Sequence, residues 1–180
     1  MVKKISSAEY IYTLQFDYIE TYSLLRGAEY EAFMSKDDEE FKNLHERKKR
    51  GAILIPGEEK RYLELFKPKE DPVLINDKNE FHWSSEKIGF FKRSEPRAQT
   101  LIEILNTEID EVPKWRCPPV FRDALVFYDG NQQIVSVLNI CFGCENLMNK
   151  PLGFLIADSK TYSLLRQFLT DLGHKIEPAN

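Results

Sequence analysis

Three cysteines carry the clearest chemical signal in this sequence. Cys141 and Cys144 form a C-x-x-C motif within the stretch ICFGC, and Cys117 is the third cysteine. A C-x-x-C turn with a late glycine lets backbone N–H groups approach the sulfurs, as in a zinc knuckle, so Cys117 could be a third zinc ligand. The side chains that could supply the fourth ligand are His174, His82, Asp123 and Glu145.

Two other interpretations of the motif stay open. In a redox pair, the first thiolate is stabilised by the N-terminus of a following helix. Here the following segment ENLMNKP is short and ends at a proline, so this interpretation lacks its usual helix. Alternatively, the cysteines pack as small apolar side chains in the core. The sequence therefore leaves buried thiols, a structural metal, and redox chemistry or a disulfide as alternatives.

A predicted β-hairpin is the element that would bring the cysteines together. Two apolar runs rich in β-forming residues flank the triplet DGN at 129–131, where glycine and asparagine accept positive φ. A two-residue loop at 130–131, with the pairing continued outward, places Cys117 opposite Cys144. The two prolines after Cys117 interrupt this pairing because proline cannot donate to a ladder. We expect the three sulfurs to converge at the open end of the hairpin.

The rest of the chain predicts an α+β fold. Helical spacing of apolar residues predicts helices at 6–34, 96–106 and 159–172. A cap-like Ser35, acidic residues in the first turn and basic residues in the last predict a helix at 35–50, which completes an N-terminal helical pair. Short apolar runs between turn residues predict strands at 52–55, 62–66, 73–75 and 87–91. Together with the hairpin, they predict a mostly antiparallel sheet with helices packed on one face. We expect a helical segment at 1–50 and an α+β domain at 51–180, together forming one folding unit.

One hexapeptide occurs twice. TYSLLR stands at 21–26 and again at 161–166, and the sequences that flank the two copies do not match. A shared helical pattern explains the repeat more simply than a duplicated module. The sequence therefore predicts a helix at both places.

The C-terminal third of the chain resembles a group of uncharacterised bacterial proteins. The resemblance rests on Cys117, the stretch ALVFYDGNQQIVSVLNICFGCENL, a following GF, and a terminal helix of the type LLRQFLTDLG. In this group a cysteine precedes a hairpin of the form aliphatic-Phe-Tyr-Asp, and the second strand ends in Ile-Cys-Phe-x-Cys. Many members have His or Arg between the first cysteine and the strand, where this chain has Arg122. The resemblance implies a bacterial protein with no assigned activity.

Length and charge exclude several classes of protein. A chain of 180 residues suits a single core that is stable unaided. The net charge of -4 argues against a general nucleic-acid binder. The N-terminus mixes acidic residues into its apolar positions, unlike a signal peptide, and no run of apolar residues is long enough to span a membrane. An odd number of cysteines favours the reducing cytoplasm.

The sequence lacks the usual motifs of catalysis. It contains no Walker loop, no G-x-G-x-x-G, no H-E-x-x-H and no G-x-S-x-G. Phe81, His82 and Trp83 stand in a polar stretch, as an exposed aromatic anchor for a partner would. We expect a small, non-enzymatic bacterial binding protein, immunity- or adaptor-like, with a protein partner and a structural cysteine cluster. The alternative is a thiol-redox or metal-dependent enzyme that uses Cys141 and Cys144.

Overall fold

The computed structural model describes residues 5–66, 73–113 and 117–176. The chain forms two compact units, which we treat separately. One unit comprises Met1–Leu24 and Asp71–Asn180, and the other comprises Leu25–Glu70. The predicted boundary at residue 50 falls inside the second unit.

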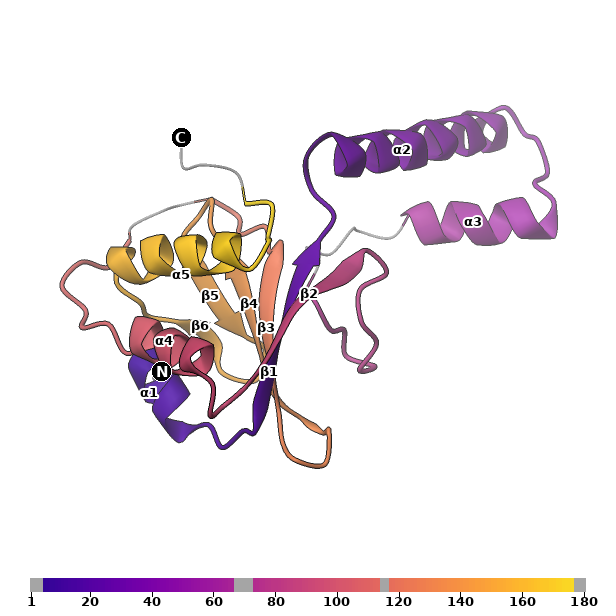
Figure 1. The fold of residues 1–180 in the computed structure, drawn as a ribbon. Helices are drawn as coiled ribbons and strands as arrows, with labels where there is room; N and C mark the ends of the chain where they lie inside the picture. Colours follow the sequence, from indigo (N-terminus) through magenta and orange to yellow (C-terminus); the bar gives the residue numbers. More distant parts are fainter. Residues whose placement is uncertain (1–4, 67–72, 114–116, 177–180) are drawn as a thin grey trace. The chain divides into compact units, whose positions relative to one another are not determined.

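A six-stranded antiparallel sheet forms the centre of the larger unit (Figure 1). Its strands are β1 (Tyr18–Leu24), β2 (Ser85–Lys92), β3 (Asp123–Tyr128), β4 (Ile134–Cys141), β5 (Asn146–Asn149) and β6 (Gly153–Leu155). Their order across the sheet is β2-β1-β3-β4-β5-β6. All six residues of β3 are buried, because β3 lies in the interior of the sheet and both of its faces are covered. The predicted antiparallel α+β fold is confirmed.

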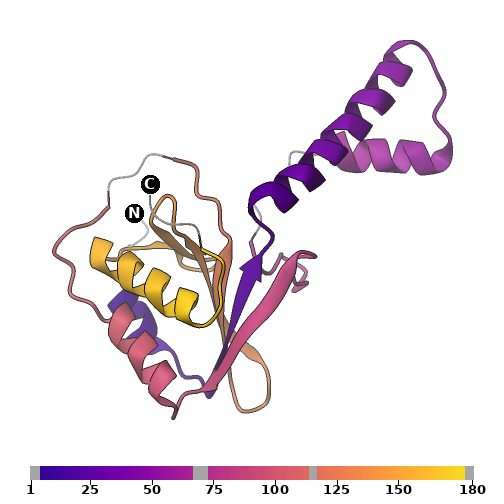
Figure 2. The same cartoon turned by 45° about the horizontal axis from the view of Figure 1, so that its top comes forward.

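Three helices pack on one face of this sheet (Figures 1 and 2). They are α1 (Ser7–Thr13), α4 (Pro96–Leu105) and α5 (Ser159–Asp171). A capping box between Ser6 and Glu9 begins α1, and the Asp158 side chain caps α5 by accepting from the backbone N–H of Lys160. Apolar residues of the three helices and the facing strand positions form the main core. The prediction that helices cover one face is therefore confirmed.

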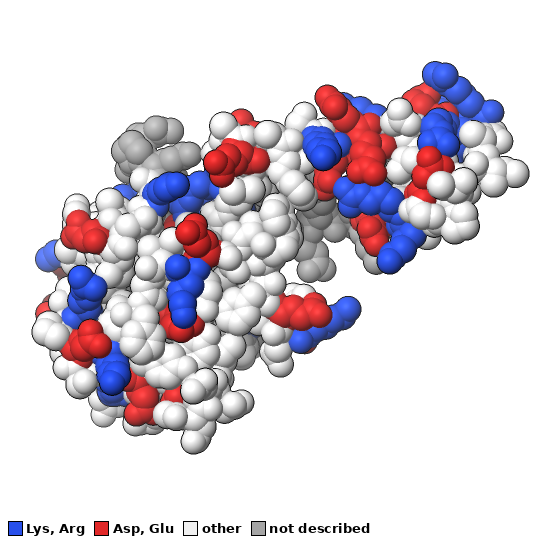
Figure 3. Space-filling model, turned by 45° about the vertical axis from the view of Figure 1, so that its right-hand side comes forward, with Lys and Arg blue, Asp and Glu red and all other residues white. Residues whose placement is uncertain are grey.

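The smaller unit contains two paired helices, α2 (Gly27–Lys49) and α3 (Pro56–Phe66). Ion pairs join them, including Arg47 with Glu58 at 2.7 Å and Lys48 with Glu59 at 2.7 Å. The rings of Phe41 and Tyr62 stack with their centroids 5.6 Å apart. Figure 3 shows charges of both signs interspersed along this unit. No residue of α3 is buried, so surface pairs rather than a deep core hold the two helices together.

The structure corrects three parts of the secondary-structure prediction. Two helices do form in the N-terminal region, but strand β1 lies between them, inside the helix predicted for 6–34. The predicted strands at 52–55 and 62–66 are wrong, because the first is a loop and the second belongs to α3. At the start of this helix, the Glu58 side chain accepts a hydrogen bond from the backbone N–H of Ile55 at 3.1 Å. Of the predicted strand at 73–75, only Ile75 forms an isolated bridge.

The hairpin of β3 and β4 forms, but its loop has three residues rather than two. The backbone N–H of Asp129 donates to the carbonyl of Gln133 at 3.0 Å, and Gln132 adopts a left-handed φ of 64°. The Asp129 carboxylate accepts from the backbone N–H groups of Asn131 and Gln133, which stabilises this wider turn. The longer loop shifts the register by one residue, and a bulge between Phe127 and Tyr128 shifts it by one more, so Asp123 pairs with Ile140. A two-residue loop with unbroken pairing would have paired Asp123 with Leu138. A shift of two residues keeps each side chain on its expected face.

Candidate functional site

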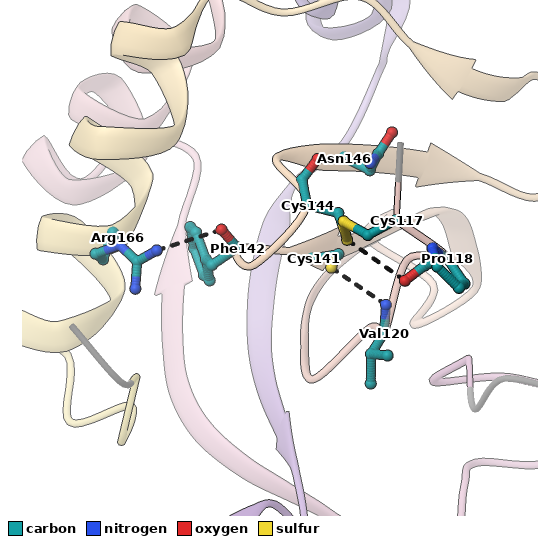
Figure 4. Close-up of a disulfide and its surroundings, with 8 residues drawn as sticks. All are labelled: Cys117, Pro118, Val120, Cys141, Phe142, Cys144, Asn146 and Arg166. Carbon is teal, nitrogen blue, oxygen red and sulfur yellow. Dashed lines mark hydrogen bonds between the residues drawn. A yellow bond between two sulfur atoms is a disulfide. The ribbon is translucent and has the colours of Figure 1, made fainter. Parts of the chain in front are cut away.

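A disulfide joins Cys117 to Cys144 at the open end of the β3–β4 hairpin (Figure 4). Their Cα atoms are 6.0 Å apart. Cys117 is exposed in the segment that leads into β3, whereas Cys144 is buried in the turn between β4 and β5. The prediction that these two cysteines meet is therefore confirmed, although the hairpin loop is longer than expected.

Cys141 is a free thiol beside this disulfide. It is the last residue of β4, only 2% of its surface is exposed, and it packs with Phe121 and Cys144. The backbone N–H of Val120 donates to its Sγ at 3.2 Å. The three cysteines thus form one cluster that contains a disulfide and a thiol.

Two further contacts fix the backbone around the cysteine cluster. The carbonyl oxygen of Pro118 lies 3.4 Å from Sγ of Cys144, and it would accept a hydrogen bond from that thiol after reduction of the disulfide. Arg166 of α5 donates to the carbonyl of Phe142 at 3.3 Å and lies over its ring at 5.0 Å. The turn that carries Cys144 is therefore held by α5, and the segment that carries Cys117 is held through sulfur contacts.

The structure does not bring His174 to the cysteine cluster. Its Nδ1 lies 2.7 Å from Oδ1 of Asp123, and its Nε2 lies 2.9 Å from Oγ1 of Thr21. Thr21 and Asp123 lie on the helix-covered face of the sheet, because their neighbours Ile19 and Leu125 two residues along belong to the main core. Cys141 faces the opposite side. Two of the four suggested fourth ligands, His174 and Asp123, are thus paired with each other.

The arrangement of the cysteine cluster does not fit a zinc site. Sulfurs joined in a disulfide offer no thiolate to a metal, which leaves Cys141 as the one thiol ligand. Within residues 5–66, 73–113 and 117–176, no group of three His, Cys, Asp or Glu side chains is placed to hold a metal ion. Ligation of zinc by Cys117, Cys141, Cys144 and His174 stays a prediction, and we make no proposal that depends on it.

The predicted redox pair of Cys141 with Cys144 also differs from the observed linkage. The disulfide joins Cys144 to Cys117 instead. The element that follows the C-x-x-C motif is strand β5, beginning at Asn146, so no helix N-terminus stabilises a thiolate here. Of the alternatives left open by the sequence, the structure shows a disulfide accompanied by one buried thiol.

A second candidate site lies on the sheet face opposite α1, α4 and α5. Aromatic side chains of this face contact one another, and together with Trp83, whose ring contacts that of the neighbouring His82, they form what we call the aromatic surface. Its members are Tyr18, Tyr22, Phe81, Trp83, Phe90 and Tyr128. The ring of Tyr18 stacks on Tyr128 at 4.8 Å and contacts Phe90 at 5.3 Å, while Tyr22 contacts Phe81 at 5.1 Å. Trp83 is 60% exposed and Phe90 is 49% exposed.

Glu20 supplies the charge within the aromatic surface. Its carboxylate accepts from the hydroxyl of Tyr22 at 2.6 Å and from Nζ of Lys87 at 3.0 Å. Burial and the hydrogen bond to Glu20 raise the pKa of Tyr22, and burial raises the pKa of Tyr128 to about 12. Both phenols are therefore neutral at physiological pH. The surface is apolar and aromatic, with one paired carboxylate near its centre.

The network of Thr21, His174 and Asp123 was not predicted from the sequence. Its order of hydroxyl, imidazole and carboxylate is that of a catalytic triad, but the three side chains are at most 2% exposed. Gly89 of β2 lies opposite Thr21, and a Cβ atom there would come within 2.9 Å of the threonine Oγ1. Because the network is sealed on every side, it attaches the segment after α5 to the sheet rather than presenting a nucleophile.

Searches of protein-family models, of curated proteins and of solved structures find no match to this chain. The resemblance of the C-terminal third to an uncharacterised bacterial group therefore stays a prediction. No helix in the described part of the chain combines the length and the apolar character that a membrane span requires.

Proposed function

We propose that this protein is a non-enzymatic binding protein whose partner is another protein, held on the aromatic surface. The observation that carries the proposal is a set of aromatic side chains, of which Trp83 is 60% and Phe90 49% exposed, on a sheet face that no described helix of this unit covers. An immunity- or adaptor-like role in a bacterial cell is the class of function that such a protein fits.

The physical properties of the aromatic surface suit a protein interface. Tryptophan and aromatic side chains supply most of the binding energy at interfaces, because they bury a large area and lose little conformational entropy. Here ring stacking already restrains Tyr18 against its neighbours. A partner would therefore find a pre-formed apolar platform, with Trp83 and Phe90 as the side chains that lose the most water on binding.

Charge at the aromatic surface favours a protein over a nucleic acid. Proteins that stack bases on aromatic rings also surround them with cationic side chains for the phosphates. On this face, Lys87 is paired with the carboxylate of Glu20, and the chain as a whole carries a net charge of -4. An anionic backbone would meet Glu20 near the centre of the platform. A partner with apolar side chains and a cationic rim would not meet that repulsion.

The test begins with capture of a partner from an extract of the native cells, using the wild-type protein and single variants. Trp83→Ala and Phe90→Ala remove the two most exposed rings of the aromatic surface. Tyr12→Ala is the matched control, because Tyr12 is an exposed aromatic residue of α1, on the other side of the sheet. We expect one protein to be retained by the wild type and by Tyr12→Ala but lost from the other two.

Reconstitution with the purified partner decides the matter. Titration calorimetry should show that Trp83→Ala weakens binding by about 2 kcal/mol or more, in the range of an interface hot spot. Circular dichroism must show that both variants keep the wild-type fold. Equal affinity of the wild type and both aromatic variants for every captured protein would overturn the proposal.

A further inference from the structure

We propose that the cysteine cluster is an exchangeable disulfide site, in which Cys141 attacks the Cys117–Cys144 disulfide and releases an exposed thiol at Cys117. The exchange is independent of partner binding at the aromatic surface. It makes Cys117 a site for covalent modification by thiol-reactive or disulfide compounds.

The arrangement of the three sulfurs carries the proposal. Cys141 packs in the same cluster as Cys144, three residues away in the chain, and it is the one thiol that the disulfide leaves reduced (Figure 4). The backbone N–H of Val120 donates to its Sγ at 3.2 Å, which holds this sulfur in the cluster beside Cys144. The attacking sulfur of Cys141 and the sulfur of Cys144 that it attacks thus lie in one cluster of buried side chains.

The exchange needs no external oxidant or reductant. The thiolate of Cys141 forms a bond to Sγ of Cys144, and the bond between Cys144 and Cys117 breaks. The electron pair of the broken bond leaves on Sγ of Cys117, which then takes a proton from water. One disulfide and one thiol exist before and after the step, so the oxidation state of the cluster does not change.

The two cysteines of the disulfide differ in solvent exposure, and this difference determines which sulfur leaves in the exchange. Cys144 is buried beside Cys141, whereas Cys117 is exposed. The leaving thiolate is therefore produced at the position where water solvates it best. After exchange, the segment that carries Cys117 loses its covalent link to the β4–β5 turn. A sulfur that was locked in a disulfide becomes an accessible nucleophile.

The experiment maps the disulfides without reduction. Trypsin separates Cys117, in peptide 117–122, from Cys141 and Cys144, which both lie in peptide 123–160 because Pro151 blocks cleavage after Lys150. The oxidised protein is incubated without oxygen near the ordinary thiol pKa of about 8.5, with N-ethylmaleimide present. We expect peptide 117–122 to be released with a maleimide label while peptide 123–160 acquires an internal disulfide.

Cys141→Ala and Cys141→Ser are the decisive variants. Both are made so that a folding defect in one of them does not prevent the test. Each should keep the two peptides linked, and labelling of Cys117 should slow by about tenfold or more relative to the wild type. Wild type treated with dithiothreitol shows the labelling expected of a fully reduced cluster.

Three results would overturn the proposal. The purified wild type could contain no Cys117–Cys144 linkage under non-reducing conditions. The label could appear on Cys141 while peptides 117–122 and 123–160 stay linked. Labelling of Cys117 could proceed equally fast in the Cys141 variants, in which case an external nucleophile opens the disulfide.

Discussion

The hexapeptide TYSLLR adopts two different structures within this one protein. At 21–26 its first four residues complete strand β1, and at 161–166 the whole hexapeptide lies inside helix α5. The sequence predicted a helix at both places. Identical residues therefore do not decide between strand and helix here, and the difference must come from what surrounds each copy.

The two copies bury different leucines. In β1, Leu24 is buried against the segment around Leu74, whereas in α5 the equivalent Leu164 is 37% exposed and the next residue, Leu165, is fully buried. A strand directs alternate residues to opposite faces, so position 24 falls on the same face as Tyr22. A helix instead groups positions 161, 162 and 165 on one side. The period of the backbone thus selects which leucine enters a core.

The sequences next to each copy explain the choice of structure. Asp158 caps the start of α5 just before the second copy, and its carboxylate also accepts from the backbone N–H groups of Asp110 and Glu111. The first copy has no such cap and instead pairs with β2 on one side and β3 on the other. Ladder hydrogen bonds from two strands outweigh the small helical preference of these residues.

The largest expected change in stability comes from replacing the leucines of the two TYSLLR copies. Leu24→Ala and Leu165→Ala should each lower the free energy of unfolding by about 3 kcal/mol, since each leaves a cavity in a core. Leu164→Ala, at the position equivalent to Leu24, should cost less than about 1 kcal/mol because this side chain is partly exposed. Urea denaturation measures all three. Equal costs at the equivalent positions 24 and 164 would contradict the assignment of strand and helix.

The next largest difference in stability is expected between the first residues of the two copies, Thr21 and Thr161, which are both fully buried. Thr21→Val leaves Nε2 of His174 without its partner and should cost about 1 to 3 kcal/mol. Thr161 has no hydrogen-bond partner for its Oγ1 among the described residues, so Thr161→Val should be neutral or slightly stabilising. Thermal unfolding of the two isosteric variants measures the difference. A larger loss at 161 than at 21 would show that the buried network is not formed.

The smallest expected change in stability comes from Tyr22 and Tyr162, the second residues of the two copies, and appears only at alkaline pH. Burial is the first cause that raises the pKa of both Tyr22 and Tyr162, helped by Glu20 at the first and by Glu145 at the second. An unfolded tyrosine ionises near pH 10, while these two stay protonated in the folded protein. Stability should therefore be unaffected below about pH 10 and fall as the pH rises above it.

Replacement of either tyrosine should make this alkaline loss less steep. Tyr22→Phe and Tyr162→Phe each remove one group that ionises earlier in the unfolded chain, and the double variant should show the sum of both changes. Unfolding measured as a function of pH tests the expectation. A slope that both variants leave unchanged would show that neither phenol is protected from ionisation.

Much of the fold could be predicted from local patterns. The hairpin of β3 and β4, strand β2 and helices α4 and α5 have caps, turn residues or a clear period close by in the sequence. Strand β1 could not be predicted in this way, because its apolar residues also fit helical spacing and its partners are distant in the chain. Helix α3 was missed for a similar reason, since the rings of Tyr62 and Phe66 contact that of Phe41 in α2, which is distant in the chain.

Of the candidate sites, one could likewise be predicted from a local pattern, whereas the others depend on residues that are distant in the chain. The meeting of Cys117 with Cys144 was predicted from the hairpin, although the predicted pairing of the two strands differs from the observed one by two residues. The place of His174 could not follow from any such hairpin, because Thr21 and Asp123 reach it from two different strands. The aromatic surface was seen in the sequence only through the stretch from Phe81 to Trp83. Its other members face the same side through pairing of β1 with β2 and β3.

The helical unit at Leu25–Glu70 stands in the chain between β1 and β2, which are adjacent in the sheet. Closing so long a connection costs chain entropy, and the cost grows with the logarithm of its length. Local helix pairing can shorten the connection early, because helices form within about a microsecond. Neighbouring strands lie only about 5 Å apart, so a short turn could also span this gap. Leu24 at the end of β1 pairs with Ser85 at the start of β2, so the chain returns from this long connection to the place where it left the sheet.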